Sequence, residues 1–273
     1  WPRVGLAVIL RSETMSQFDE SKHARERDGK FAVKPHAEAE GVSLGVATPT
    51  REVVDDVEMW RLPNGLLHRE GGPARTLEDG TQEWWENGKL HRVGEPAVIR
   101  ADGRQEWYWD GELHSFEAPA RTLEDGTQEW YLEGQLHRTG GPAVIRADGY
   151  EATYRHGELE REEWHLPDGT QHRDGGPAVV WPGKGEAWMQ HGKLHREGDL
   201  PAFTRPNGVQ EWYQHGRLHR EGGPAVIRAK GGYEAWYKDG RLHRDDGGPA
   251  ITYGDGTKQW WVNGHEQDPP AGN

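Results

Sequence analysis

An internal repeat limits the fold of this chain more than any other feature. Pro-Ala pairs mark the repeated units, and their prolines are Pro73, Pro96, Pro119, Pro142, Pro177, Pro201, Pro224 and Pro249. Successive pairs lie 23, 23, 23, 35, 24, 23 and 25 residues apart. A period of this length indicates stacked units, because one short unit cannot bury its own hydrophobic face.

The composition is typical of a thin, repeated core. Only 33% of the residues are hydrophobic, which is below the usual share of a globular domain. The 38 glycines and 14 tryptophans favour short strands and tight turns over packed helices. The sequence has no cysteine, which excludes a disulfide-stapled fold and any thiol-based metal or redox site.

Each unit contains two turn signals, as in Asp102-Gly103 followed by Asp110-Gly111. Asp-Gly and Asn-Gly tolerate positive φ at both central positions, so each signal predicts a hairpin with a type I′ turn. We therefore expect an all-β fold of tandem antiparallel β-hairpin repeats, about 23 residues each, in an elongated meander or solenoid.

The second turn of a unit sets the register of its hairpin. With Asn87-Gly88 at the centre, the predicted pairs are Trp85 with Leu90, Trp84 with His91, and Glu83 with Arg92. Equivalent ion pairs are expected between Glu129 and Arg138 and between Glu211 and Arg220. Aromatic and opposite-charge pairs across strands stabilise a sheet by about 0.2–1 kcal/mol each.

Two aromatic columns run through the repeats on neighbouring positions. The first column is Trp84, Trp107, Trp130, Trp188, Trp212, Trp236 and Trp260, with Thr153 as its break. The second is Trp85, Tyr108, Tyr131, Tyr154, Met189, Tyr213, Tyr237 and Trp261. Neighbouring strand residues point to opposite faces, so we expect a sheet that is covered on both sides or curls on itself. The ladder should be interrupted at Thr153.

The chain also contains a larger duplication. Similar segments that begin at Trp60 and Trp164 lie 104 residues apart, and four Pro-Ala pairs follow each of them. We therefore predict a first four-repeat block at 58–161, a second at 162–268 and a tail at 269–273, with the 35-residue step as the seam.

The motifs Gly-x-Leu-His-Arg, Gly-Pro-Ala, Asp-Gly and Glu-Trp-Tyr recur across residues 58–268. This pattern resembles the MORN-like repeat, in a variant found in bacterial and large-virus proteins. The resemblance implies an interaction or scaffolding module, which is what most such arrays are. Some such arrays are tied to membranes or proposed as antitoxins. The Leu-His-Arg motif departs from the standard MORN consensus, so the lipid association is not carried over.

The first 57 residues are charged and lack periodicity, which predicts a disordered leader. Residues 18–32 resemble a leader of uncharacterised actinobacterial proteins of phage or plasmid type, with Ala24 where proline is usual. Residues 1–14 are expected to be an upstream extension of the reading frame before a start at Met15, or alternatively a fragment artefact. Their apolar run, Gly5 to Leu10, is too short to span a membrane and lacks the flanks of a signal peptide. We expect a cytoplasmic protein.

A histidine column is the most conspicuous polar feature. It consists of His68, His91, His114, His137, His172, His195, His219 and His243. Successive members should lie about 10 Å or more apart, since each unit adds two strands at about 4.8 Å per strand. One ion cannot bridge that distance, so no metal or cofactor is expected. The rings are expected to stack on tryptophan, or alternatively to form a polar column that contacts a ligand.

No phosphate loop, nucleophile elbow or His-Glu-x-x-His motif is present in the sequence, and the carboxylates recur with the repeat. We therefore expect no enzymatic activity. The candidate binding residues are the first aromatic column and the histidines His91, His114, His137, His195, His219 and His243. Phe116 joins them, because Ser115-Phe-Glu-Ala118 replaces the usual polar loop and should expose a phenylalanine at a contact point.

Three functions fit these features. The first is a non-enzymatic scaffold that binds another protein. The second is a carbohydrate or cell-envelope binder that uses the aromatic columns, and the third is an acidic DNA mimic or antitoxin-like neutraliser. The net charge of −13 argues against binding to nucleic acid, which depends on clustered Lys and Arg. The sequence does not indicate an oligomeric state.

Overall fold

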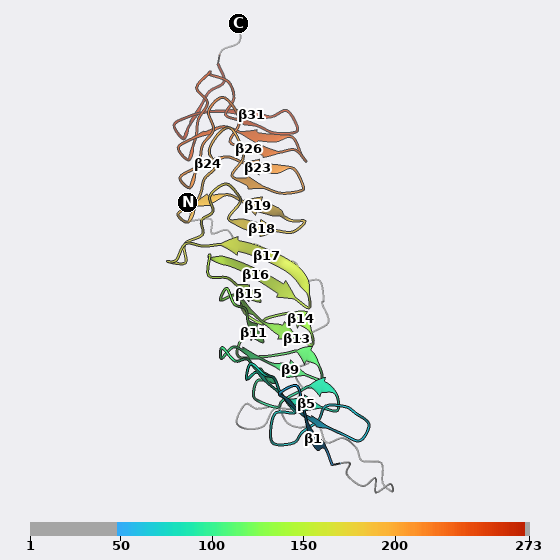
Figure 1. The fold of residues 1–273 in the computed structure, drawn as a ribbon. Helices are drawn as coiled ribbons and strands as arrows, with labels where there is room; N and C mark the ends of the chain where they lie inside the picture. Colours follow the sequence, from blue (N-terminus) through green and yellow to red (C-terminus); the bar gives the residue numbers. More distant parts are fainter. Residues whose placement is uncertain (1–47, 271–273) are drawn as a thin grey trace, which may run out of the picture.

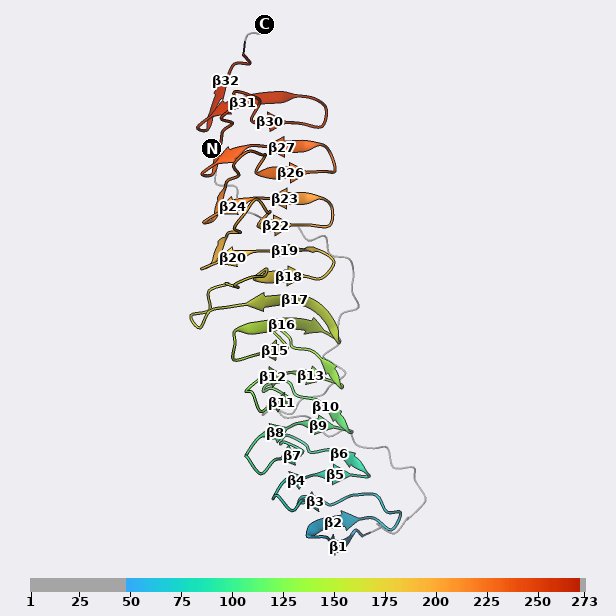
Figure 2. The same ribbon diagram turned by 45° about the horizontal axis from the view of Figure 1, so that its top comes forward.

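The computed structural model describes residues 48–270, and this part of the chain is all-β without any helix. Twenty strands form one antiparallel sheet that runs the whole length of the molecule (Figures 1 and 2). Each strand of this sheet pairs with the next sheet strand along the chain, so the sheet is a simple meander. The predicted fold of tandem hairpins is confirmed. The predicted leader up to residue 47 lies outside the described residues.

The strands of the main sheet are mostly short. In chain order they are β1 (Thr50–Val54), β2 (Val57–Arg61), β3 (Arg75–Thr76), β4 (Gln82–Glu83), β7 (Val98–Ile99), β8 (Gln105–Glu106), β11 (Arg121–Thr122), β12 (Gln128–Glu129), β15 (Val144–Ile145) and β16 (Tyr150–Arg155). They continue with β17 (Glu158–Trp164), β18 (Val179–Trp181), β19 (Gly185–Ala187), β22 (Phe203–Thr204), β23 (Val209–Glu211), β26 (Val226–Arg228), β27 (Tyr233–Ala235), β30 (Ile251–Thr252), β31 (Lys258–Val262) and β32 (His265–Gln267).

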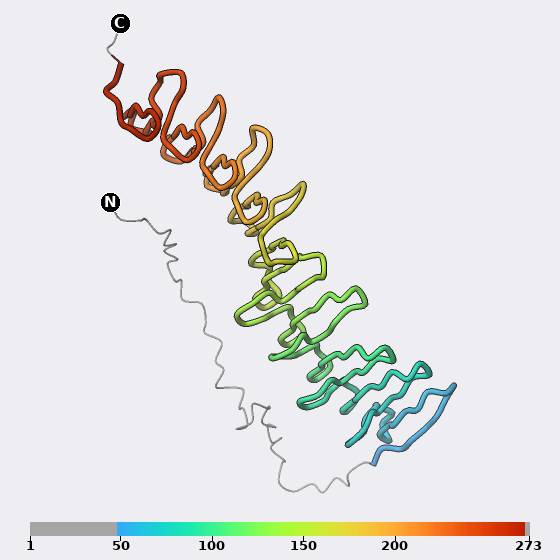
Figure 3. Tube along the Cα trace, turned by 90° about the vertical axis from the view of Figure 1, so that its left-hand side faces the viewer, coloured from blue at the N-terminus to red at the C-terminus, as the bar shows by residue number. Residues whose placement is uncertain are grey.

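Six small two-stranded hairpins, which we call side hairpins, lie between these strands in the sequence. They are β5 (Trp85–Glu86) with β6 (Lys89–Leu90), β9 (Tyr108–Trp109) with β10 (Glu112–Leu113), β13 (Tyr131–Leu132) with β14 (Gln135–Leu136), β20 (Met189–Gln190) with β21 (Lys193–Leu194), β24 (Tyr213–Gln214) with β25 (Arg217–Leu218), and β28 (Tyr237–Lys238) with β29 (Arg241–Leu242). A regular unit thus adds one sheet hairpin and one side hairpin, and the units repeat as loops along one axis (Figure 3).

The two turns of a unit have different geometries. In a side hairpin, φ is 49° at Asn87 and 79° at Gly88, as a type I′ turn requires. In a sheet hairpin, Gly80 has positive φ and its N–H donates to the carbonyl oxygen of Leu77, whereas Asp79 does not have positive φ. This is a type I turn followed by a glycine bulge, so the predicted type I′ turn is wrong here. Oδ1 of Asp79 accepts the N–H of Thr81 at 2.8 Å, which stabilises the longer turn.

The alanine of every Pro-Ala pair is completely buried. These residues, each with 0% exposure, are Ala74, Ala97, Ala120, Ala143, Ala178, Ala202, Ala225 and Ala250. The N–H of Ala97 donates to the carbonyl oxygen of Glu106, and its own carbonyl oxygen accepts the N–H of Trp84. The alanine therefore lies where the chain passes between two strands, and the surrounding backbone leaves no room for a larger side chain.

Residues of the side hairpins and of the main sheet form the hydrophobic core together. In the first half, Leu136 and Tyr154 pack on buried Val144. In the second half, Tyr237 and Leu242 pack around buried Val226. The second aromatic column thus faces inward in these clusters, between side hairpin and sheet.

At the seam between the two halves, the side hairpins change from one side of the main sheet to the other. After the turn at His156-Gly157, the chain has no His-Arg loop and no Pro-Ala pair to bring it back, so it continues directly as β17. Thr153 pairs with Arg161 beside a β-bulge, and Tyr150 pairs with Trp164. The side hairpins of the second half therefore lie on the side where the first half has its sheet turns. The side hairpins of the two halves lie on opposite sides of the long axis of the sheet (Figure 2). The predicted boundary at 161/162 falls inside β17.

The sheet also begins earlier than expected. The segment 1–57 was predicted to lack regular structure, but Thr50–Val54 form β1 and pair with β2 around a turn at Asp55-Asp56. All five residues of β1 are exposed, so its pairing depends on backbone hydrogen bonds and on ion pairs such as Arg61 with Glu52 at 2.7 Å. An exposed, charged strand of this kind gives little hydrophobic signal in the sequence.

Candidate functional site

Seven units contain an arginine stacked on a tryptophan, either of the first column or at Trp60 and Trp164, an arrangement we call the Arg–Trp rung. In the first regular unit, the guanidinium carbon of Arg92 lies 3.9 Å from the centroid of Trp84, and Nη1 donates to the carbonyl oxygen of Pro96 at 3.3 Å. The distances across the rungs range from 3.6 to 4.2 Å. The rungs are Arg69–Trp60, Arg92–Trp84, Arg138–Trp130, Arg173–Trp164, Arg196–Trp188, Arg220–Trp212 and Arg244–Trp236.

These rungs correct the predicted ion pairs. The predictions for Trp85 with Leu90 and for Trp84 with His91 are confirmed, but Glu83 does not pair with Arg92. Glu83 lies 3.6 Å from Arg75 on the neighbouring sheet strand instead. The other two pairs are replaced in the same way, since Glu129 binds Arg121 at 2.6 Å and Arg220 binds Asp199 at 2.6 Å. Stacking on the ring and bonding to the Pro carbonyl satisfy the arginine within its own unit.

The rungs cover the tryptophans. Trp130 and Trp212 are 4% and 6% exposed, and no tryptophan in residues 48–270 is fully exposed. Trp107, Trp188, Trp236 and Trp260 are half-buried. The candidate binding column is therefore a set of rings whose faces are mostly occupied by guanidinium groups.

The histidine column connects each unit to the next. The N–H of the first turn residue of the following side hairpin donates to histidine Nδ1, as from Asn87 to His68 at 3.1 Å and from Asp110 to His91 at 3.2 Å. The same bond recurs from Glu133 to His114, His156 to His137, His191 to His172, His215 to His195, Asp239 to His219 and Asn263 to His243. The sequence did not show this contact, because it joins residues 19 or 20 positions apart in different units.

This bond determines the state of the rings. A ring that accepts at Nδ1 is neutral, with its proton on Nε2. Several rings also pack on the next turn residue, as His195 does on His215 at 4.5 Å between centroids. Burial lowers the pKa of His137 and of His195, and the neighbouring His156 and His215 lower it further. The ring that stacks nearest a tryptophan is His91, 4.5 Å from Trp109, which lies outside both columns.

The loop from Ser115 to Ala118, the third in the chain, does not expose its phenylalanine as predicted. Phe116 is half-buried rather than exposed, and its ring meets His114 edge-on at 4.8 Å. Ser115 takes the place of the rung arginine, and its Oγ donates to the carbonyl oxygen of Ala118 at 2.7 Å. The phenylalanine packs on the histidine because this loop has no arginine to hold it.

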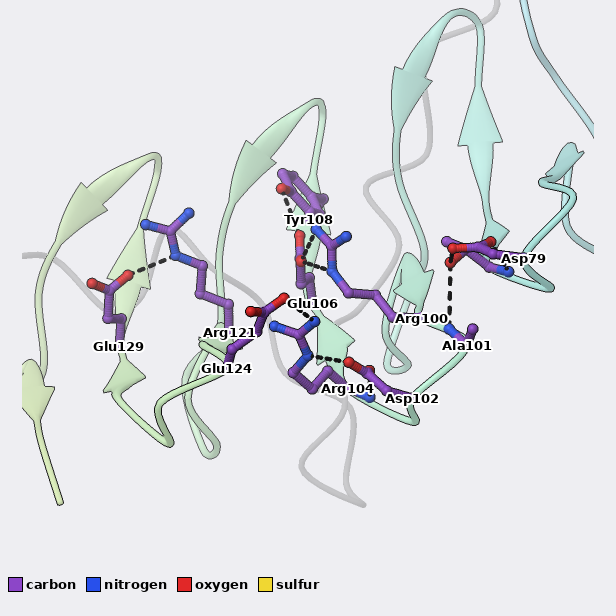
Figure 4. Close-up of polar contacts among 11 residues, drawn as sticks. Asp79, Arg100, Ala101, Asp102, Arg104, Glu106, Tyr108, Arg121, Glu124 and Glu129 are labelled. Carbon is purple, nitrogen blue, oxygen red and sulfur yellow. Dashed lines mark hydrogen bonds and ion pairs between the residues drawn. The ribbon is translucent and has the colours of Figure 1, made fainter.

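A network of carboxylates and arginines lies on the main sheet of the first half, and Glu106 is its buried member (Figure 4). Glu106 is 7% exposed and accepts hydrogen bonds from Arg100 Nε at 2.6 Å and from the Tyr108 hydroxyl at 3.0 Å. Burial, together with the Glu106 carboxylate, raises the pKa of Tyr108 to about 12. These partners were not predicted, because a cross-strand register was set only for the side hairpins and not for the sheet hairpin that joins Arg100 and Glu106.

One group in residues 48–270 has the residue types of a metal site. Glu151, Glu163 and His165 place their ligand atoms within 4.8 Å of one another at the seam. Glu163 is already bound by Arg161 at 2.7 Å and by Gln171 at 2.6 Å. Its carboxylate is thus neutralised by protein groups, and the arrangement is explained as an ion-pair network.

The side-hairpin turns form an exposed row along each half of the molecule. A Cβ placed on Gly216 would lie 3.5 Å from Cβ of Lys193, so the residue after each turn glycine lies over the turn of the next unit. We call these rows turn ridges. The first-half ridge contains Lys89, Glu112 and Gln135, and the second-half ridge contains Lys193, Arg217 and Arg241. The second-half ridge borders an open cavity of about 540 Å³.

No protein-family model and no curated protein matches this chain. In the range 48–270, no helix has the length and apolar character that a membrane crossing needs.

Proposed function

We propose that the chain is a non-enzymatic binding scaffold whose partner is another protein. The observation that carries this proposal is the continuous row of exposed side-hairpin turns along each half. The N–H of Gly216 donates to the carbonyl oxygen of Leu194 and that of Gly240 to Leu218, each at 2.8 Å, so neighbouring turns are held in contact. Stacked repeats offer extended surfaces that a partner contacts at several units at once.

The likeness of the motifs to MORN-like repeats supports the same function. The recurring Leu-His-Arg and Gly-Pro-Ala segments have structural roles in every regular unit, through the histidine link, the rung and the buried alanine. What varies between units is the exposed turn, as in Asp110, Glu133 and His215. Variation in exposed turns is typical of a scaffold that carries a recognition surface.

Carbohydrate binding through the aromatic columns has less support. Sugar rings stack on open aromatic faces, whereas the rung arginines lie 3.6–4.2 Å from the tryptophan centroids. A glycan would have to displace a guanidinium that also bonds to a Pro carbonyl in its own unit.

The DNA-mimic hypothesis requires carboxylates grouped without cations. At the sheet turns of the first half, Arg104 contacts Asp102 at 2.6 Å and Glu124 at 3.1 Å (Figure 4). Guanidinium groups are thus interspersed with the acidic residues, which does not favour a mimic of the phosphate backbone.

A parallel screen of the full chain tests the proposed function. The chain is presented to a display library of random peptides and, in the same buffer, to a glycan array. We expect reproducible peptide enrichment, saturable binding of the selected peptides and no saturable glycan binding. Glycan binding that weakens when Trp188 or Trp236 is replaced by Ala, together with no peptide enrichment, would overturn the proposal.

A further inference from the structure

The second-half ridge presents one unpaired cation per unit. Lys193, Arg217 and Arg241 are exposed, and within residues 48–270 none of the three forms an ion pair or a side-chain hydrogen bond. In a chain with a net charge of −13, three successive cations without carboxylate partners are unusual. Most other arginines of the second half are used, for example in the rungs.

Contacts with the turn glycines hold the three cations in a row. The aliphatic stem of each lies over the turn glycine of the next unit, with 3.5 Å from Lys193 to the Cβ position of Gly216 and 3.7 Å from Arg217 to that of Gly240. Arg241 continues the row at 3.8 Å from the Cβ position of Gly264. The stems are therefore fixed while the charged ends point into solvent.

The cavity beside the ridge is lined by charges of both signs. The cavity of about 540 Å³ is bordered by Arg217, Lys238, Arg241 and His243, and also by Asp239 and Asp245. Asp245 binds Lys238 at 3.1 Å and His243 at 2.7 Å. Asp239 gains no cation from His219, because Nδ1 of that ring accepts the N–H of Asp239. Arg217 and Arg241 form no ion pair with either carboxylate and are left to interact with a ligand.

The spacing of the cations fits an extended ligand. Each unit adds two sheet strands at about 4.8 Å, so successive cations lie about 10 Å apart. A chain in the polyproline II conformation has three residues per turn and rises about 3.1 Å per residue, so every third side chain points the same way at intervals of about 9 Å. A β-strand does not match, because its residues i and i+3 point to opposite faces.

We infer that the second-half ridge binds an extended acidic peptide segment, in polyproline II conformation, with a carboxylate at every third residue. This inference rests on the proposed function and names the chemistry of the partner. The peptide is favoured over a nucleic acid because no tryptophan, tyrosine or phenylalanine of residues 48–270 is fully exposed, so the ridge lacks the large aromatic rings on which bases stack.

The first-half ridge is a natural control. It has the same stacked turns, with Gly134 3.6 Å from Glu112 and Gly157 3.8 Å from Gln135, but only Lys89 carries a positive charge. Acidic peptides should therefore avoid it. The two ridges lie along opposite edges of the molecule (Figure 2), so binding at one does not cover the other.

Fluorescence anisotropy with the full chain tests the inference. The probe is a labelled 15-residue peptide of five Glu-Pro-Pro repeats, compared with a peptide of the same composition in which the five glutamates are consecutive. We expect the spaced peptide to bind at least tenfold more tightly, with an affinity that falls as salt is raised. A labelled 15-nucleotide oligo-dT is the third probe.

Two triple variants separate the ridge from general charge effects. Lys193→Glu, Arg217→Glu and Arg241→Glu together should weaken peptide binding at least tenfold. The control combines Lys89→Glu, Lys230→Glu and Lys258→Glu, which changes the net charge equally at exposed positions away from the ridge, and should change binding less than twofold. Because all six positions are exposed, both variants should keep the circular dichroism spectrum of the parent chain.

Three results would overturn the inference. These are equal binding of the spaced and clustered peptides, equal loss in both triple variants, and binding of oligo-dT without binding of peptide. Its failure is distinguishable from failure of the proposed function. If the display screen selects peptides whose binding is indifferent to the ridge charges, the scaffold proposal stands and the ridge inference is wrong.

Discussion

The guanidinium carbon of Arg138 lies 3.9 Å from the centroid of the Trp130 ring, and Nη1 of the same group donates to the carbonyl oxygen of Pro142 at 3.2 Å. One side chain thus connects the side hairpin, the loop and the start of the next sheet strand. Trp130 is only 4% exposed beneath it. The rung therefore fixes the loop that brings the chain back to the main sheet.

Removing this rung should weaken the fold measurably. Arg138→Ala is expected to lower the free energy of unfolding by about 2 kcal/mol, since a desolvated cation–π contact and a charge-assisted hydrogen bond are both lost. Arg155→Ala, which removes an exposed arginine paired with Glu160, is the control and should cost less than about 1 kcal/mol. Urea unfolding followed by tryptophan fluorescence measures both. Equal costs would contradict the role of the rung.

The third loop offers the opposite experiment, in which a rung is restored. Its glycine position is occupied by Glu117, where the equivalent Gly94 and Gly140 have φ of 71° and 82°. The double variant Ser115→Arg with Glu117→Gly should therefore place an arginine on Trp107 and raise the free energy of unfolding by about 1 kcal/mol. Glu117→Gly alone is the matched control. No gain of the double variant over this control would count against the account.

The buried alanines should not accept a larger residue. Ala143 has 0% exposure between Trp130 and Ala152, whose backbone groups bond to it. Ala143→Leu is expected to cost about 3 kcal/mol or to abolish folding, because overpacking forces the strands apart. Ala147→Leu, at an exposed sheet turn, should cost less than about 0.5 kcal/mol. Thermal unfolding by circular dichroism distinguishes the two outcomes.

The histidine links predict a loss of stability in mild acid. The pKa of His137 and of His195 is lowered in the folded chain, whereas an unfolded histidine titrates near 6.5. Below about pH 6.5 the unfolded chain binds more protons, so this contribution to stability is present above pH 6.5 and is lost as the pH falls through the folded pKa. Protonation at Nδ1 also breaks the bond from the next unit.

Melting temperatures between pH 7 and pH 5.5 test this prediction, because most carboxylates stay ionised in that range. The melting temperature of the parent chain should fall with pH, and the fall should be smaller in the double variant His137→Asn with His195→Asn. An unchanged pH dependence in that variant would mean that other groups cause the effect.

The sequence predicted the hairpins well because their signals are local. The turn glycines and the Trp85–Leu90 and Trp84–His91 pairs belong to one side hairpin and follow from its turn. The partner of Arg92 was predicted wrongly. A period-2 pattern shows on which face of a strand a side chain lies, but it does not show whether the arginine contacts the carboxylate of Glu83 on the facing strand or the ring of the neighbouring Trp84. Links between units, such as Asn87 to His68, have no local signal at all.

The sequence also did not predict that the side hairpins change sides at the seam. The 35-residue step and Thr153 located the irregularity, but the consequence depends on a missing return segment between Leu159 and Trp164. Without it, β17 runs on and places the second-half side hairpins on the other edge. The first-half ridge and the basic second-half ridge are separated for this reason.

The most direct test of the account is a distance across the seam, because both ridges depend on one unbroken stack. Cysteines introduced at Glu112 and Arg241 would be the only two in the chain, and spin labels on them report a single separation by pulsed electron paramagnetic resonance. Eleven sheet strands lie between these side hairpins, so the account predicts about 50 Å or more. A separation below about 35 Å, as in a compact domain of this size, would contradict it.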